Sequence, residues 1–278
     1  MLSEVLQSVV LGVVQGLGEF LPISSTAHLI LVPYFFCWKD LGLAFDVALH
    51  IGTLIAVLAY FYSDWIKIFD LAIDNLKLKK AICNNSLSRG RGIMYNRNLL
   101  WFLVIATIPG ILAGYFLEEK AETIFRSPLL IAFTLAFFGL ILYLVDRRVQ
   151  HKKTLGEITS LDSIIIGLSQ AIAIIPGISR SGATITAGLF QKLDRVNAAR
   201  FSFLLSTPII FGAAVFKLPH LFREGINIAM AVGVLTSAIS GYLAIKYLLK
   251  FVQKSSYAIF FWYRLVLSLA IVLVYFLK

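Results

Sequence analysis

Two short segments of this sequence carry ionisable and hydroxyl side chains in otherwise apolar surroundings. The first contains Glu19, Ser25 and His28, and the second is centred on Arg180. Gln15 precedes Glu19 by four residues and shares its helix face, whereas Ser25 and His28 are three residues apart, close enough for a hydroxyl to meet an imidazole. An acid–base pair together with a cationic group suits the hydrolysis of a phosphate anhydride.

The second segment, residues 176–184, has the composition of an anion-binding loop. Pro176 and Gly177 make a turn, and small residues let the backbone approach a ligand. The N–H groups that open the following helix favour a phosphate, and the planar, permanently charged guanidinium of Arg180 can bind it with two hydrogen bonds. Further hydroxyl donors are Ser179, Ser181 and Thr184. This segment is therefore predicted to bind phosphate.

The elements that must position these residues are those of a membrane protein. The 278 residues are 59% hydrophobic and only 14% charged, with a mean hydropathy of +0.86. A soluble domain has about 25% charged residues, and apolar runs of about 20 residues recur along this chain. The net charge of +10 does not indicate nucleic acid, because the basic residues cluster in loops between apolar runs. We expect a lipid bilayer as partner and no nucleic acid.

Motifs for other chemistries are missing from the sequence. It contains no Walker A, GxGxxG or HExxH pattern, which argues against nucleotide-driven and zincin reactions. Cys37 and Cys83 lie in separate regions without a CxxC or His-rich neighbour, so neither a disulfide framework nor a zinc site is indicated.

The apolar pattern predicts an all-α polytopic protein with six transmembrane helices and two re-entrant helical hairpins. The hairpins are assigned to 5–36 and 162–190, each interrupted by Gly, Pro and hydroxyl residues. Proline breaks the helical ladder, and the freed backbone groups cannot face lipid. A simple kinked transmembrane helix is the alternative for each stretch. The six full spans are expected at 43–62, 98–117, 129–145, 201–217, 228–249 and 258–277.

The distribution of charge predicts the orientation. One set of loops holds 16 Lys or Arg against 6 Asp or Glu, whereas the opposite segments hold 5 basic and 6 acidic residues. The basic set is expected in the cytoplasm, which requires both stretches to return to the side they entered from and places both termini outside. The cytoplasmic loops are 63–97, 146–161, 191–200 and 250–256.

The chain also reads as one membrane domain, 1–278, built from an inverted repeat. A shift of 155 residues superposes identical residues of the two interrupted stretches and divides the chain into 1–155 and 156–278, each with one hairpin and three spans. An odd number of crossings inverts the second half, and inverted repeats place their broken helices and the ligand together near the midplane. The identical pairs include Gly12 and Gly167, Gln15 and Gln170, Ile23 and Ile178, and Ser24 and Ser179.

Other ionisable residues fall within the apolar spans and are candidates by default. Asp162, Lys217 and Lys246 lie near span ends and are expected to be structural. Arg264 lies two turns into the last span and could pair with an acid or touch an anionic head group. Asp46 and His50 share one face near the outer end of span 43–62, where they could line the site mouth or only support it.

The first motif, Gln15 to His28, resembles the first signature of the undecaprenyl-diphosphatase family (UppP, also called BacA), and Pro176 to Thr184 resembles its second. The resemblance extends over essentially the whole chain. It implies a bacterial plasma-membrane enzyme of six spans and two re-entrant hairpins, with a site open to the extracytoplasmic side. It also implies hydrolysis of undecaprenyl diphosphate to the monophosphate and phosphate, dependence on a divalent cation (Mg²⁺ or Ca²⁺), and a contribution to bacitracin resistance. A homodimer is left open.

The resemblance also assigns roles by position. Glu19 and His28 match the acid–base residues, Ser25 the candidate nucleophile and Arg180 the diphosphate clamp; the nucleophile remains open between Ser25, His28 and water. Gln15 stands where many members have Glu, and an amide is a weaker metal ligand, so Glu19 is the expected ligand. The residues expected on the diphosphate are Ser24, Thr26, Gly177, Ser179, Ser181 and Thr184.

Two other functions compete with hydrolysis. Inverted repeats with broken helices are a common transporter design, and a flippase for the product lipid would need the same clamp without Ser25 or His28. Another class of membrane lipid phosphatase places a His after its phosphate contacts, but position 186 is Thr186 and no PSGH run occurs.

Overall fold

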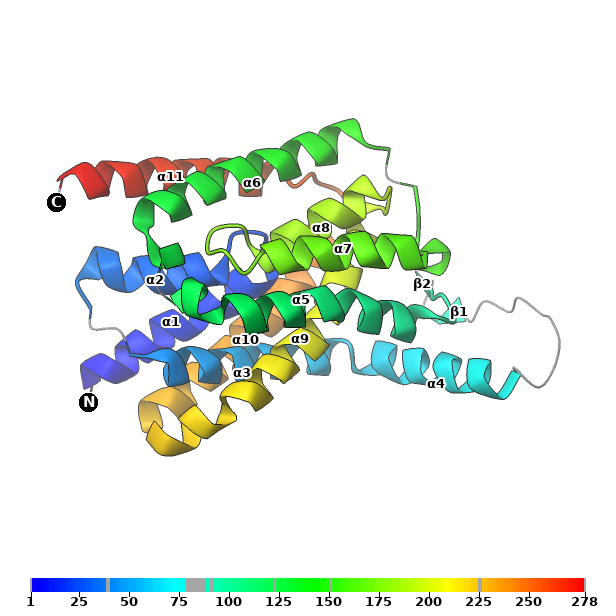
Figure 1. The fold of residues 1–278 in the computed structure, drawn as a ribbon, viewed down its shortest axis with the longest axis horizontal. Helices are drawn as coiled ribbons and strands as arrows, with labels where there is room; N and C mark the ends of the chain where they lie inside the picture. The colour runs from blue at the N-terminus through cyan, green and yellow to red at the C-terminus, as the bar shows by residue number, and fades with distance from the viewer. Residues whose placement is uncertain are drawn as a thin grey trace.

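The computed structural model describes residues 2–38, 41–78, 89–90, 93–122, 124–150, 152–224 and 227–277, which form an all-helical fold (Figure 1). A two-residue antiparallel strand pair, β1 and β2, and two short 3₁₀ helices, η1 and η2, lie in connections. The elements are α1 (Leu2–Phe20), α2 (Ser25–Phe36), α3 (Leu43–Tyr60), α4 (Tyr62–Leu78), β1 (Arg89–Gly90), β2 (Ile93–Met94), α5 (Leu99–Glu122), η1 (Ile124–Arg126), α6 (Pro128–Arg148), η2 (Leu155–Glu157), α7 (Ser160–Ile172), α8 (Arg180–Phe190), α9 (Arg195–Glu224), α10 (Ile228–Phe251) and α11 (Ala258–Leu277).

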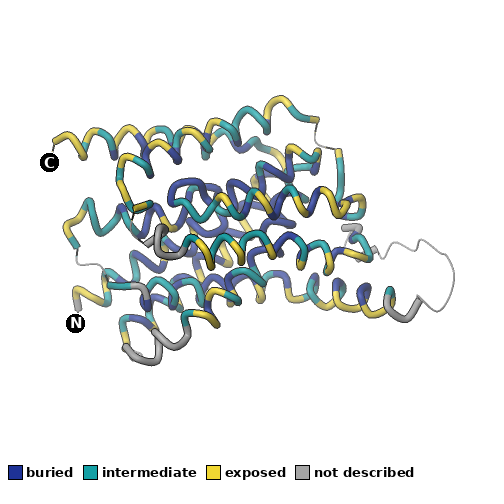
Figure 2. Tube along the Cα trace, viewed as in Figure 1, coloured by how far each residue is buried: buried dark blue, intermediate teal, exposed yellow. Residues whose placement is uncertain are grey.

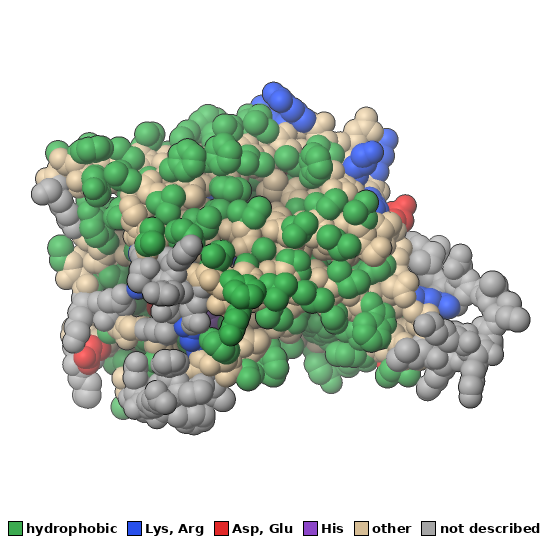
Figure 3. Space-filling model, viewed as in Figure 1, with side chains coloured by type: hydrophobic (Ala, Val, Ile, Leu, Met, Phe, Trp, Pro, Cys, Tyr) green, Lys and Arg blue, Asp and Glu red, His purple; other side chains and the backbone are tan. Residues whose placement is uncertain are grey.

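Five helices are long and apolar enough to cross a membrane, namely α5, α6, α9, α10 and α11. The pair α3 and α4 passes the same test as one unit that is bent by 70° at Phe61, which would make a sixth span. Hydrophobic side chains cover the middle of the molecule in Figure 3, while Lys and Arg side chains are visible mainly toward the end opposite the chain termini. The chain is therefore a multi-pass membrane protein, as predicted.

The structure differs from the sequence prediction after span 43–62. Residues 63–78 are predicted to belong to a cytoplasmic loop, but they lie in α4. Its buried face carries Asp64, Ile68 and Leu71 at helical spacing. The negative charge of Asp64 is neutralised inside the protein. Arg200 of α9 donates to its carboxylate at 2.5 Å, and the hydroxyl of Tyr95 donates to the same oxygen. Residues 79–88 of the predicted loop lie outside the described part of the chain.

Breaking this ion pair is expected to destabilise the fold. Asp64→Ala would leave Arg200, a residue that is 9% exposed, without its carboxylate partner. Removing one partner of a buried pair costs about 3–5 kcal/mol, so we expect a clearly lower Tm in detergent. Asp70→Ala, on the exposed face of the same helix, is the control and should leave the Tm almost unchanged. Equal Tm values for the two variants would contradict a stabilising role for the ion pair.

Two helical hairpins enter the bundle from opposite ends (Figure 1). Helix α1 runs inward from the end at which both termini lie, and α2 returns to that end; α7 runs inward from the other end, and α8 returns. Helix α1 packs against α10, and α7 packs against α5. The most deeply buried part of the chain lies in the middle of the molecule, where the turns of both hairpins meet (Figure 2).

Candidate active site

The turn of each hairpin ends in a serine with an unusual backbone. Ser24 precedes α2 with φ of 74°, and Ser179 precedes α8 with φ of 71°. A positive φ is costly for a residue with a Cβ and persists only where the surroundings impose it. At Ser179 the side chain accepts a hydrogen bond from Gly182 N and caps α8. Both helices therefore begin abruptly and direct their first N–H groups into the protein interior.

The two turns touch each other. Gly177 N donates to Ser24 Oγ at 3.1 Å, and Ser181 Oγ donates to the carbonyl of Leu21 at 3.1 Å. Gly177 has φ of 91°, and a Cβ at this position would lie 2.1 Å from Thr134 Oγ1, so a larger residue could not make this approach. The predicted meeting of the two polar segments is thus present in the structure.

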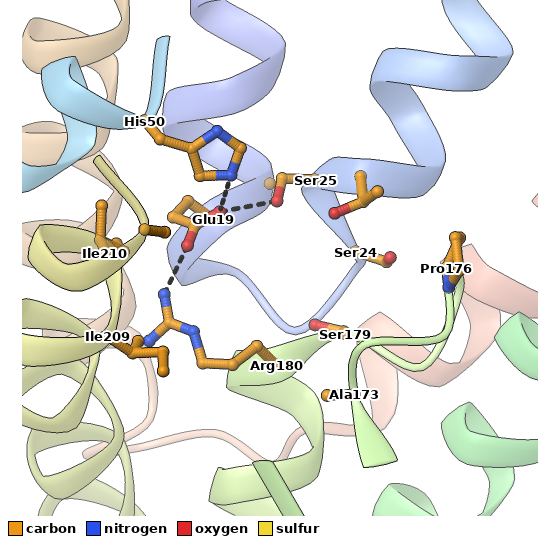
Figure 4. Close-up of a pocket in the computed structure, with 13 residues that line it drawn as sticks. Glu19, Ser24, Ser25, His50, Ala173, Pro176, Ser179, Arg180, Ile209 and Ile210 are labelled. Atoms are coloured by element: carbon orange, nitrogen blue, oxygen red, sulfur yellow. Dashed lines mark hydrogen bonds and ion pairs between the residues drawn. The ribbon is translucent and has the colours of Figure 1, made fainter. Parts of the chain in front are cut away.

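Glu19 is the centre of the polar contacts (Figure 4). Its Oε1 pairs with Nη2 of Arg180 at 2.5 Å across the hairpin interface. Its Oε2 accepts hydrogen bonds from Ser25 Oγ at 2.7 Å and from Gln15 Nε2 at 3.0 Å, and it lies 3.7 Å from His50 Nε2. The carboxylate is 8% exposed. Because a buried carboxylate requires such partners, the network holds Glu19 ionised beside a serine hydroxyl.

These groups line one pocket. Of the predicted site residues, the described lining includes Glu19, Ser24, Ser25, Thr26, Ser179 and Arg180. One wall is apolar and comes from the middle of α9. The remaining lining residues are Gly18, His50, Ala173, Pro176, Ile209, Ile210 and Ala213. The pocket therefore combines a polar, cationic floor with a hydrophobic side.

Three predicted substrate residues are placed behind the pocket. Thr184 Oγ1 contacts Ser202 Oγ at 2.7 Å, and Ser181 is bound to the Leu21 carbonyl. The backbone N–H of Gly177 donates to Ser24 Oγ, as described above. None of the three belongs to the described pocket lining. Gly177 and Ser181 join the two hairpin turns, whereas the Thr184 side chain joins α8 to α9.

His28 also faces away from the pocket. Its Nδ1 lies 2.7 Å from the Ser24 carbonyl and must donate to it, because a carbonyl only accepts. Its Nε2 lies 2.6 Å from the hydroxyl of Tyr263 and, in the neutral ring, accepts from it. The two rings stack with centroids 5.7 Å apart. Both nitrogens are thus engaged, and the predicted role of His28 in proton transfer stays a prediction.

His50 lines the pocket, whereas the sequence left open whether it lines the site or only supports it. Its Nδ1 donates to the carbonyl of Asp46 at 2.7 Å, which directs the other nitrogen toward Glu19. In the neutral ring this nitrogen carries a lone pair. The sequence feature that marks His50 as a candidate is the imidazole itself, since an ionisable residue within an apolar span is a functional candidate by default.

The donor set suits a cation that is held jointly with a substrate. Among the described residues, Glu19 is the single carboxylate of the pocket lining, and no group of three or more His, Cys, Asp or Glu gathers elsewhere. Mg²⁺ is usually bound by one or two carboxylates plus substrate phosphates. Gln15 keeps a buried Oε1 without a partner but does not belong to the described lining.

Comparisons with known proteins agree with this chemistry. The family model described as bacitracin resistance protein BacA matches residues 8–270. The chain is 52% identical to an undecaprenyl-diphosphatase of Moorella thermoacetica over 274 residues, covering 99% of each protein. It is 50% identical to an undecaprenyl-diphosphatase of Pelotomaculum thermopropionicum, covering 96% of each, and 47% identical to one of Desulforudis audaxviator, covering 98% of each.

Proposed function

Because the chain belongs to the BacA family, we propose that it is an undecaprenyl-diphosphatase whose active site is the pocket between Ser24 and Ser179. It hydrolyses undecaprenyl diphosphate to undecaprenyl phosphate and inorganic phosphate. This reaction returns the lipid carrier to peptidoglycan synthesis and counters bacitracin, which competes for the same lipid. The observation that carries the proposal is the contact of Glu19 with both Arg180 and the hydroxyl of Ser25.

Arg180 binds the diphosphate. Its Nη1 is anchored to the carbonyl of Ser202 at 3.3 Å, which fixes the guanidinium, while Nη2 faces Glu19 in the pocket. A diphosphate carries more charge than one carboxylate and accepts two parallel hydrogen bonds from a guanidinium. The substrate therefore displaces Glu19 from Arg180, and the carboxylate that is released from its ion pair becomes a stronger base.

Ser25 is the nucleophile of the proposed mechanism. Its Oγ attacks the terminal phosphorus while its proton passes to Glu19, which already accepts that hydrogen bond. The bond from this phosphorus to the bridging oxygen breaks, and undecaprenyl phosphate leaves. Water then attacks the phosphoserine and gives one proton to the neutral imidazole of His50. The bond between phosphorus and Ser25 Oγ breaks as Glu19 returns its proton to that oxygen, and phosphate departs. His50, beside Glu19, is the imidazole in reach of this water.

The apolar wall receives the lipid. Ile209, Ile210 and Ala213 of α9 line the pocket on one side of the polar floor. A prenyl chain is recognised by apolar contact alone, whereas the diphosphate needs the charged groups. The scissile anhydride is proposed to lie at the boundary between these surfaces, near Arg180.

A divalent cation, Mg²⁺ or Ca²⁺, would be held by Glu19 together with the oxygens of the diphosphate. When bound, it would neutralise charge on the phosphate groups. The protein residues bind, orient and deprotonate as described above, and Arg180 supplies the positive charge that belongs to the chain itself.

The two halves form an inverted repeat with two re-entrant hairpins. The identical pairs at a shift of 155 residues support this. Ser24 and Ser179 both have a positive φ, of 74° and 71°. A Cβ on Gly12 would lie 2.6 Å from a carbonyl of α10, and a Cβ on Gly167 would lie 2.6 Å from a carbonyl of α5. Equivalent glycines thus permit close packing of equivalent helix pairs, α1 on α10 and α7 on α5.

The end of the molecule that carries both termini lies outside the cytoplasm. The opposite end carries basic residues of α6, α8–α9 and the α10–α11 connection, as expected for cytoplasmic segments. The pocket is lined by His50, in the middle of α3, and by residues in the middle of α9, so it lies between the two ends of the molecule. The site is proposed to open to the extracytoplasmic side, as the family resemblance implies. The basic residues include Arg147, Arg148, Lys152, Lys192, Lys250 and Lys254.

Phosphate release by the detergent-purified full chain tests the proposed function. Undecaprenyl diphosphate and a short-chain prenyl diphosphate are expected to yield one phosphate per molecule, whereas the corresponding monophosphates should yield none. A flippase would bind the same lipids and release no phosphate. Absence of release from both diphosphates, with Mg²⁺ or Ca²⁺ present, would overturn the proposal in favour of transport.

A further inference from the structure

Arg264 is a buried cation that the proposed mechanism does not use. It lies in α11 and is fully buried, with 0% of its surface exposed. Its Nη2 donates to the carbonyl of Ile178 at 2.7 Å, while Nε and Nη1 have no hydrogen-bond partner among the described residues. No carboxylate of the described chain lies within ion-pair distance of it. A single buried charge of this kind is costly unless another group compensates it.

The contact with Ile178 determines which way the next peptide group points. The peptide bonds of the described chain are trans, and in a trans peptide the C=O and N–H point in opposite directions. Because the Ile178 carbonyl points to Arg264, the N–H of Ser179 points away from Arg264. Ser179 itself lines the pocket. The guanidinium thus pulls the carbonyl to the rear of the turn and leaves the N–H on the ligand side.

This N–H belongs to a row of unused donors. The backbone N–H groups of Ser179, Arg180 and Ser181 have no acceptor among the described residues, whereas Gly182 N is bound by Ser179 Oγ. Successive N–H groups at the start of a helix form an anion site. Reversing the Ile178–Ser179 peptide would replace the first donor with a carbonyl oxygen, which repels phosphate.

The packing around Arg264 leaves little room for another arrangement. A Cβ on Gly139 of α6 would lie 3.1 Å from its Cδ, and a Cβ on Gly182 of α8 would lie 3.0 Å from its Nη2. The guanidinium is therefore held between α6 and the first turn of α8. Its positive charge adds to that of the helix N-terminus, and the group that can compensate both is an anion in the pocket.

We propose that Arg264 is a positioning residue for the diphosphate site: through Ile178 O it holds the Ser179 N–H toward the ligand, and its buried charge supports anion binding from behind the loop. This inference rests on the proposed function for the identity of the ligand as a diphosphate. Arg264 does not touch the substrate, so it is not a catalytic residue. It couples the last helix of the chain to the turn of the second hairpin.

The test compares Arg264→Met and Arg264→Lys with Ser268→Ala. Ser268, one turn further along α11, makes a buried hydrogen bond to the Ala132 carbonyl at 2.7 Å and serves as the matched structural control. Binding of inorganic pyrophosphate is measured directly, beside Tm and steady-state kinetics. Arg264→Met is expected to weaken pyrophosphate binding by about tenfold or more, as for loss of a hydrogen bond to a charged group. The pyrophosphate affinity of Arg264→Lys, which keeps the charge, should lie between those of wild type and Arg264→Met.

Comparing pyrophosphate binding with Tm separates a positioning role from an effect on stability. Ser268→Ala should lower the Tm at most and leave pyrophosphate binding within twofold of wild type. If Arg264→Lys, or Arg264→Met where it folds, binds pyrophosphate as wild type does, the inference is overturned. If wild type releases no phosphate from prenyl diphosphates but binds pyrophosphate in an Arg264-dependent way, the inference stands and the proposed function fails.

Discussion

Replacing Arg180 by alanine is expected to lower kcat/KM by at least about a hundredfold, the loss seen when a charge-stabilising group is removed from an active site. The substitution removes the cation that binds the diphosphate and also leaves Glu19, at 8% exposure, without its ion-pair partner. Arg180→Lys should recover little of this loss. An ammonium cannot bond Ser202 O and a phosphate in the fixed geometry of a guanidinium.

Phosphate release by purified variants measures this effect. Arg147→Ala is the matched control, because this arginine lies on an exposed surface over the ring of Tyr143 and has no contact with the pocket. It should remain within about twofold of wild type, as is usual for surface substitutions. Near-normal turnover by Arg180→Ala would mean that the diphosphate is bound elsewhere and would remove the pocket as the active site.

The meeting of the two hairpin turns could be predicted from the sequence because the signal is local. Pro22 and Pro176 interrupt helices inside apolar stretches, and each is followed by hydroxyl residues that only a polar interior can accommodate. The contact between Glu19 and Arg180 follows from the same reasoning, since two buried opposite charges at facing turns lower each other's cost. The five apolar spans after residue 98 were likewise predictable from length and composition.

The direction of individual side chains was not predictable in this way. His28 lies on the same segment as Ser25, but its ring turns toward Tyr263, which is 235 residues further along the chain. His50 reaches Glu19 from a helix of its own, and nothing in its spacing from Asp46 distinguishes a pocket residue from a supporting one. These outcomes depend on the positive φ of Ser24 and on helix packing, and neither has a signature in one sequence.

Helix α4 was missed for a similar reason. Its three aspartates and two lysines resemble those of a solvated loop. The structure buries Asp64 against Arg200, which lies 136 residues further along the chain, whereas Asp70 and Asp74 are exposed. Hydropathy measures the average polarity of a segment and cannot recognise a charge that is neutralised by a distant residue.

Replacing Ser25 by alanine is expected to reduce turnover by about a thousandfold and to abolish any covalent phosphoenzyme, since loss of a nucleophile that acts together with its base has effects of this size. Its hydroxyl is the one that donates to Glu19 Oε2, at 2.7 Å. Ser8→Ala, which removes an α1 hydroxyl bonded only to the Glu4 carbonyl, is the control and should keep near-normal turnover.

Rapid acid quench after mixing with a prenyl diphosphate labelled in its terminal phosphate distinguishes the three nucleophiles that the sequence left open. A phosphoserine survives acid, whereas a phosphohistidine does not, so acid-stable label in wild type that is lost in Ser25→Ala identifies the serine. Label that appears only under alkaline quench would indicate an imidazole; since both nitrogens of His28 are engaged, His50 would then be examined first. If no label is trapped and Ser25→Ala keeps more than about a tenth of wild-type turnover, Glu19 must activate water directly, and the hydroxyl of Ser25 serves only to orient the carboxylate.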